Sequence, residues 1–191
     1  GRIFRHLRQG GKKRRKRMPG AEKRGKLANK PMIDTRPETI ELRHIKMELV
    51  SPFTTSMGTE YDEEHIIVRV DGEGFTGWGE SVAEGTPFYS YETVTTARNI
   101  LHDFLTPSIL SKDISDIDSA IASYEKVRGH MMAKAGLEAA LWDLFAKSKN
   151  ISLSKMIGGT RKKIDVGVSI GIQSSVSDLI KKIDGYLAEG Y

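Results

Sequence analysis

Residue types that could perform chemistry are few in this sequence and poorly arranged for it. The 191 residues include no cysteine, which excludes a disulfide framework, a thiol nucleophile and any cysteine-based metal site. No pair of histidines has the spacing of metal ligands, and no Gly-x-Ser-x-Gly, phosphate-binding or dinucleotide-binding motif occurs. The sequence therefore contains no active site that is complete in itself.

The remaining polar candidates each have a structural interpretation. Asp71 and Glu73 form a carboxylate pair inside Asp-Gly-Glu-Gly, a pattern more typical of a tight turn than of a metal site. His102 and Asp103 lie near a predicted helix end, where solvation or capping accounts for them. His130 precedes a long apolar helix and is interpreted as a capping or hydrogen-bonded histidine.

A basic segment opens the chain. Residues 1–30 hold 13 of the 30 Lys and Arg residues and one of the 25 acids, a local charge of +12, so the rest of the chain carries −7. The run Lys12–Arg17 repels itself and predicts a disordered tail over residues 1–37. Binding to nucleic acid is the alternative, but no interleaved aromatic residues or binding fold support it. No apolar run reaches the ~18 residues that a membrane span needs, and a cytoplasmic location is expected.

The elements that must position any site begin with a sheet. Alternating apolar residues and a strong turn signal predict three antiparallel strands. We expect a strand over 40–49 with a bulge at 43–44, a loop over 51–59, and strands over 64–70 and 75–82 joined by the turn at 71–74. These three strands form one face of an α+β domain.

Helices follow the strands. A helix capped by Ser90 is predicted to end before Thr106-Pro107. Ser115, with Asp118 three residues later, resembles a capping box. The helix predicted over 131–147 is apolar around a wide face and should be buried. A short turn over 153–157 ends this domain.

The last part of the chain changes period again. Residues 164–172 alternate aliphatic with small side chains, as a barrel strand does, and Ser175 and Gly190 bound a predicted amphipathic helix. A strand followed by a helix calls for another parallel strand, so we expect a truncated chain. The predicted fold is an α+β cap domain over 38–160, with a three-stranded antiparallel sheet plus helices, followed over 161–191 by the first βα unit of a truncated (β/α) barrel.

Six short motifs in register resemble one known family. They are VSPFTTSMGT (50–59), GWGE (77–80), PFYS (87–90), GHMMAK (129–134), GVSIG (167–171) and EGY (189–191). In this order and spacing they are similar to the enolase superfamily, muconate-cycloisomerase subgroup, and most to the o-succinylbenzoate synthases and N-acylamino acid racemases. The resemblance covers about residues 38–191.

The resemblance implies a Mg²⁺-dependent enzyme in which a lysine removes the proton α to a carboxylate. The reaction would be a dehydration in menaquinone biosynthesis, a racemisation of N-acylamino acids, or both. Dipeptide epimerase and muconate cycloisomerase are the alternatives within the superfamily. The catalytic lysines and metal ligands are expected after Tyr191, so this chain alone should be inactive. The parent protein should be a homo-oligomer acting on a small carboxylate.

The resemblance also implies which residues of this chain contact the substrate. The matching positions are Phe53, Ser56, Met57, Tyr89 and Ser169. The first three match a mobile loop over the substrate, which excludes water, and ordinary cap-domain packing is an equal alternative for Phe53 and Met57. A packed tyrosine is the alternative for Tyr89. Glu84 departs from the family, which has an apolar residue there, and its carboxylate would repel an anionic substrate.

Overall fold

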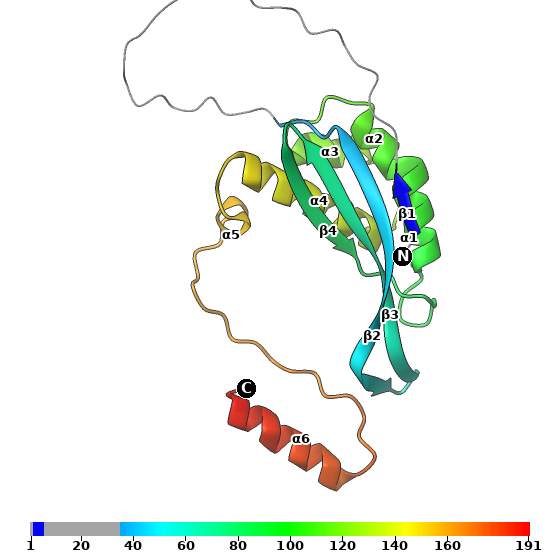
Figure 1. The fold of residues 1–191 in the computed structure, drawn as a ribbon, viewed down its shortest axis with the longest axis vertical. Helices are drawn as coiled ribbons and strands as arrows, with labels where there is room; N and C mark the ends of the chain where they lie inside the picture. The colour runs from blue at the N-terminus through cyan, green and yellow to red at the C-terminus, as the bar shows by residue number, and fades with distance from the viewer. Residues whose placement is uncertain (1, 6–34) are drawn as a thin grey trace, which may run out of the picture.

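The computed structural model describes residues 2–5 and 35–191. An antiparallel sheet lies against a layer of helices, and a C-terminal arm leaves this body and ends in a separate helix (Figure 1). The strands, which pair in chain order, are β1 (Arg2–Arg5), β2 (Thr39–Thr55), β3 (Gly58–Gly72) and β4 (Phe75–Ser81). The helical segments are α1 (Val94–Ile100), the π-helical turn η1 (Leu101–Leu105), α2 (Thr106–Leu110), α3 (Ile117–Ser123), α4 (Met131–Ser148), α5 (Leu153–Met156) and α6 (Val176–Glu189).

The three predicted strands are present, but β2 and β3 form a longer hairpin than expected. The predicted loop over 51–59 is the tip of this hairpin. The bulge predicted at 43–44 is wrong, because pairing runs unbroken from Thr39 opposite Asp71 to Glu48 opposite Asp62, and the irregularity lies between Glu48 and Phe53. The apolar alternation along β2 changes phase without a bulge. Beyond this point the hairpin extends past the helices (Figure 1), so its side chains have no core to face.

The predicted basic tail lies mostly outside the described residues. Positions 6–34 are not described, so their expected disorder stays a prediction. Residues 2–5, in contrast, form β1 along the edge of β2, with Arg2 opposite His44 and Arg5 opposite Glu41. An edge strand exposes a row of unpaired backbone groups, which a four-residue segment can satisfy locally.

The turn predicted at 71–74 is confirmed. Glu73 and Gly74 both have left-handed backbone angles, with φ of 49° and 83°, as a two-residue hairpin turn requires. The Asp71 carboxylate accepts hydrogen bonds from the Thr76 hydroxyl (2.5 Å) and the Arg69 guanidinium (3.0 Å). Asp71 therefore serves the turn, as its sequence context indicated.

The first helical segment begins and ends later than predicted. Its N-cap is Thr93, which forms a reciprocal capping box with Thr96, and Ser90 instead accepts the Glu92 N–H. The helix also does not end before Pro107 but passes into α2 through η1. Proline lacks an N–H and its ring collides with the carbonyl four residues earlier, and a π-helical turn widens the helix to accommodate such an irregularity.

The next cap is displaced by one residue. Asp116, rather than Ser115, caps α3 and shares a capping box with Ser119. The N–H of Ser119 donates to the Asp116 carboxylate, which lowers the pKa of Asp116 below its ordinary value. The sequence pattern located the helix start, but two adjacent capping residues competed for it.

The long helix α4 is the centre of the core, as predicted. Its inner side chains are fully buried, including Leu137, Leu141 and Phe145. On β4, Gly77 and Gly79 face this helix so closely that a Cβ at Gly79 would lie 2.1 Å from the Gly136 carbonyl oxygen. The Gly-Trp-Gly-Glu motif thus alternates glycines that admit the helix with outward-facing residues.

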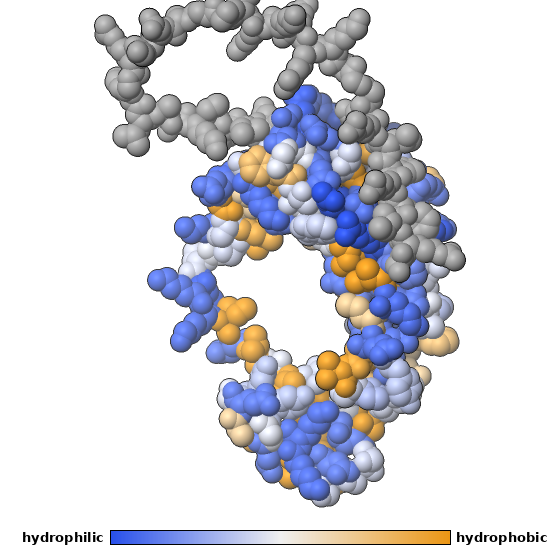
Figure 2. Space-filling view, viewed as in Figure 1, coloured by the Kyte–Doolittle hydropathy of each residue, from blue (hydrophilic) through white to orange (hydrophobic). Residues whose placement is uncertain are grey.

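The predicted first barrel strand is not formed. Residues 161–173 run without sheet pairing, and among the described residues their backbone bond to the body joins the Ile172 N–H to the Thr54 carbonyl oxygen (2.8 Å). A strand is stable only beside a partner, and no parallel strand within the described part of the chain lies next to this segment. An opening separates it from the body (Figure 2).

The helix predicted after this segment is confirmed. Ser175 caps α6 by accepting the Asp178 N–H (3.1 Å), and Gly190 ends it with φ of 98°. None of its side chains is buried. Local sequence signals therefore define α6 although none of its residues reaches the buried core.

Candidate functional site

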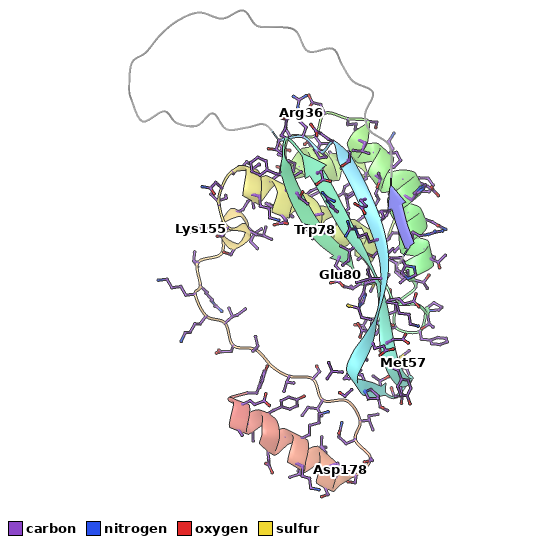
Figure 3. All side chains as sticks on the ribbon, in the orientation of Figure 1. Arg36, Met57, Trp78, Glu80, Lys155 and Asp178 are labelled. Atoms are coloured by element: carbon purple, nitrogen blue, oxygen red, sulfur yellow. The ribbon has the colours of Figure 1, made fainter. Side chains whose placement is uncertain are left out.

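Three of the five sequence-predicted site residues lie at the tip of the β2–β3 hairpin. Phe53 is 37% exposed and Met57 is 56% exposed, and Ser56 occupies the turn between the strands. The turn is tightened by a hydrogen bond from the Met57 N–H to the Thr55 hydroxyl (3.1 Å). Figure 3 shows Met57 at the end of the hairpin, far from the helical layer. The tip therefore presents apolar side chains beyond the core of the body.

The structure joins this tip to the segment that carries Ser169. The Phe53 ring lies against Gly171, where an added Cβ would be 3.1 Å from Phe53 Cδ2. The adjacent Ile172 donates its N–H to Thr54. Ser169 itself is exposed, two residues from this contact. A side chain at position 171 would crowd Phe53 and the Thr54 backbone, so glycine favours the close approach by which the tip and the arm form one surface.

Tyr89 belongs to a different loop, between β4 and α1. Its side chain is 74% exposed and that of its neighbour Phe88 is 71% exposed. The loop is closed at its base by a hydrogen bond from the Val94 N–H to the Glu84 carbonyl oxygen (2.8 Å). The predicted site residues therefore come from three separate segments, of which the structure brings two into contact.

An acidic cavity lies between the hairpin and this loop. It has a volume of about 300 Å³ and is lined by Glu60, Asp62, Glu63, Glu64, Glu84, Gly85 and Thr86. Partial burial, together with the nearby charges of Glu60 and Glu63, raises the pKa of Glu84 above its ordinary value. Lys46 pairs with Asp62 (2.9 Å), which offsets part of the negative charge. A cavity of this charge disfavours a carboxylate substrate.

Sequence reasoning found one member of this cavity and missed the others. Glu84 was identified because a carboxylate stands where the resembling family has an apolar residue. Of the acids at 60–64, the predicted strand over 64–70 includes only Glu64, although the density of Glu-Tyr-Asp-Glu-Glu is a visible signal. None of the five predicted site residues lines the cavity.

The Mg²⁺ implied by the resemblance does not fit the residues present. Over residues 35–191, no group of three His, Asp or Glu side chains is arranged to hold a metal ion, whereas Mg²⁺ prefers octahedral oxygen ligands at about 2.0–2.1 Å. The acids of the cavity are partly committed to other partners, as in the 2.8 Å contact between His65 Nε2 and Glu63. No step of a reaction is therefore assigned to a metal on this chain.

The two histidine candidates have structural roles. His102 Nδ1 contacts the carboxylate of Asp103 (2.5 Å) at an exposed position. His130, interpreted from the sequence as a capping or hydrogen-bonded histidine, occupies the N-cap position of α4 with a left-handed backbone (φ of 55°), but its side chain makes no capping bond. The capping bonds come instead from Glu92, which lies 40 residues before Met132, the helix residue that it binds, and no local sequence pattern reveals this partner.

Comparison with known proteins identifies relatives of this chain. The sequence model of the "Mandelate racemase / muconate lactonizing enzyme, N-terminal domain" matches residues 38–158. An o-succinylbenzoate synthase of Geobacillus stearothermophilus is 49% identical over 155 residues, which make up 81% of this chain and 41% of the relative. An N-succinylamino acid racemase of Thermus thermophilus is 39% identical over 154 residues, covering 81% of this chain and 42% of the relative. The chain thus spans about two fifths of the length of these relatives.

Solved structures agree with the fold. A member of the enolase superfamily from Listeria innocua superposes with a TM-score of 0.76 at 35% identity, covering 82% of this chain and 43% of the other. The three-stranded antiparallel sheet with helices, β2 to α5, corresponds to the N-terminal domain of these proteins.

No helix among the described residues has the length and apolar character to cross a membrane.

Proposed function

The chain belongs to the mandelate racemase / muconate lactonizing enzyme family, and on that premise we propose that it forms the cap of an o-succinylbenzoate synthase-like enzyme. The parent enzyme abstracts a proton α to a carboxylate, and either dehydrates its substrate to o-succinylbenzoate or racemises N-succinylamino acids. The names of the relatives that are 49% and 39% identical support these two activities.

The contribution of this chain is a lid and part of the pocket wall. The observation that carries the proposal is the contact between the hairpin tip and the arm, where Phe53 meets Gly171 and Thr54 binds Ile172. A mobile apolar tip that closes over Ser169 would exclude water from the reacting carboxylate. The base and the ligands of a Mg²⁺ ion are assigned to residues after Tyr191. The parent protein is further proposed to be a cytoplasmic homo-oligomer.

The experiment is to express the complete coding sequence and assay both reactions. Formation of o-succinylbenzoate and exchange of the α-proton of an N-succinylamino acid in D₂O are followed separately, by absorbance and by NMR. Either activity supports the proposal. Epimerisation of dipeptides or cycloisomerisation of muconate, with neither of the two, would establish one of the alternatives within the superfamily.

A second class of function, nucleic-acid binding by the basic segment, is tested with the same protein. Counterion release makes such binding fall steeply with salt. Binding that disappears on removal of residues 1–30, in a protein without turnover, would favour this alternative. Sequence-specific binding by residues 32–191 is not expected, since the charge outside the basic segment is negative.

The lid is tested by truncating its apolar side chains. Phe53→Ala and Met57→Ala should raise KM or lower kcat, on the order of tenfold, because an open lid admits water and misplaces the substrate. Met47→Ala is the matched control, since Met47 is similarly exposed (48%) on the same hairpin but away from its tip. Equal kinetics for all three variants would remove the lid from the proposal.

A further inference from the structure

The loop that carries Tyr89 is held at both ends. Its base is closed by the hydrogen bond from the Val94 N–H to the Glu84 carbonyl oxygen (2.8 Å), with a bridge between Glu84 and Thr93. The residues inside this closure include Phe88 and Tyr89, both more than two-thirds exposed. The loop therefore displays two aromatic rings from a fixed base.

Glu92 fastens the end of this loop to the core. It is 2% exposed, and each of its carboxylate oxygens accepts one backbone N–H from the first turn of α4, from Met132 (2.9 Å) and Ala133 (3.1 Å). The first N–H groups of a helix have no partner within the helix, and a carboxylate is favoured there by the helix dipole. Glu92 thus supplies the cap that the side chain of His130 does not.

Tyr91 adds a second attachment at the same place. Its hydroxyl accepts the His130 N–H (3.3 Å), and its ring lies edge-on to the His130 ring with centroids 6.3 Å apart. Tyr91 and Glu92, which follow the displayed rings after Ser90, are therefore both bound to the start of α4. This helix is in turn packed against β4 at Gly77 and Gly79, so the loop is connected to the most deeply buried part of the body.

We propose that Glu92 is a positioning residue, which holds Tyr89 in place over the substrate by anchoring its loop to the N-terminus of α4. The proposal rests on the proposed function, which assigns Tyr89 to the substrate. Glu92 touches no substrate itself. Its two bonds fix the end of the loop, so a change there moves Tyr89 without altering the chemistry of the pocket.

The test is Glu92→Gln in the protein expressed from the complete coding sequence. Glutamine keeps the size but offers one carbonyl oxygen where two N–H groups need acceptors, so the anchor is half lost. We expect kcat/KM to fall on the order of tenfold to a hundredfold, as for displacement of a substrate-positioning group by about 1 Å. Glu125→Gln, at an exposed position outside the loop, is the matched control and should leave kinetics unchanged.

A double-mutant cycle with Tyr89→Ala separates positioning from general damage. If Glu92 acts through Tyr89, Glu92→Gln should lower kcat/KM by a much smaller factor in the Tyr89→Ala background than in the wild type. An equal loss in both backgrounds would overturn the proposal. If Glu92→Gln does not fold, Tyr91→Phe takes its place in the cycle, because it removes a single acceptor at the same attachment.

Amide exchange keeps this proposal distinct from the proposed function. Exchange at Met132 and Ala133, and chymotryptic cleavage after Phe88 or Tyr89, should both accelerate in Glu92→Gln. A wild-type protein without turnover would refute the proposed function, yet faster exchange and cleavage would still support the anchor. Unchanged exchange and cleavage would overturn the anchor whatever the enzyme does.

Discussion

The body over residues 35–157 and the arm over residues 158–191 fold by different means. The body buries a continuous cluster in which α4 contacts the sheet and the other helices, with Leu137, Leu141 and Leu144 fully buried. The arm has correct local signals at both ends of α6, yet none of its residues is buried. Capping and amphipathic pattern are therefore sufficient to define a helix, whereas packing needs a complementary surface.

The same difference explains why one predicted strand formed part of a sheet and another did not. Residues 64–70 pair with β2, and from Ile66 onward they also pair with β4. Residues 164–172 have an equally regular alternation, but most of their apolar side chains remain exposed, including Ile164 at 69% and Val166 at 66%. Alternation predicts which side chains share a face, and it does not supply a neighbour.

The largest expected effect contrasts two leucines. Leu141→Ala, in the buried face of α4, should lower the free energy of unfolding by about 2–5 kcal/mol, because it leaves a cavity. Leu187→Ala, 61% exposed in α6, should change it by less than ~0.5 kcal/mol. Urea unfolding followed by tryptophan fluorescence measures this, since Trp78 and Trp142 both lie in the body. A comparable loss for Leu187→Ala would show that the arm contributes to the core.

A second contrast uses two glycines. Gly79→Ala places a Cβ against the backbone of α4 and should cost about 1–3 kcal/mol through overpacking. Gly185→Ala meets open space in α6 and should stabilise that helix by about 1 kcal/mol. Urea midpoints report the first effect and NMR chemical shifts of residues 176–189 the second. A stable Gly79→Ala protein would contradict the close approach of β4 and α4.

A third test concerns the cap of the arm. Ser175→Ala should cost α6 about 1 kcal/mol and leave the unfolding of the body unchanged. The Ser175 and Ser174 hydroxyls hold the pKa of Asp178 below its ordinary value, so this pKa should rise in the variant. An NMR titration of Asp178 reads the change directly, with Ser177→Ala as control. A constant pKa would mean that these hydrogen bonds do not persist in solution.

Much of the body could be predicted from local patterns. The turn at 71–74, the buried helix α4 and the caps of α6 each depend on neighbouring residues, whose physical preferences are visible in the sequence. Among the helices, the predictions that were wrong concern helix ends and caps, which depend on residues distant in the sequence or on a choice between two adjacent capping residues. The passage of the helix through Pro107 depends on η1, and the cap of α4 depends on Glu92, which is distant in sequence.

The candidate site was predictable only through the family resemblance. The motif identified Phe53 and Met57, and the fold brings the Phe53 ring against Gly171 of the arm. The acidic cavity was missed because Glu60 and the acids at 62–64 lie on β3 and meet Glu84 only in the folded chain. Spacing along one strand does not indicate which loop will lie beside it.

The smallest expected effect concerns an unfavourable charge in the otherwise well-packed body, the carboxylate of Glu84. Burial and the charges of Glu60 and Glu63 raise the pKa of Glu84, while His65 lowers it. Between the unfolded value near 4.5 and the raised folded value, the native state binds more protons, so this group adds stability as the pH falls through that window and opposes folding above it. Glu84→Gln should therefore stabilise the body at pH 7, by no more than about 0.5 kcal/mol, and give a smaller gain at pH 4. Thermal unfolding at the two pH values measures this gain in stability, with Glu125→Gln as control. A gain that is larger at pH 4 than at pH 7 would show that the ionised Glu84 carboxylate does not destabilise the body.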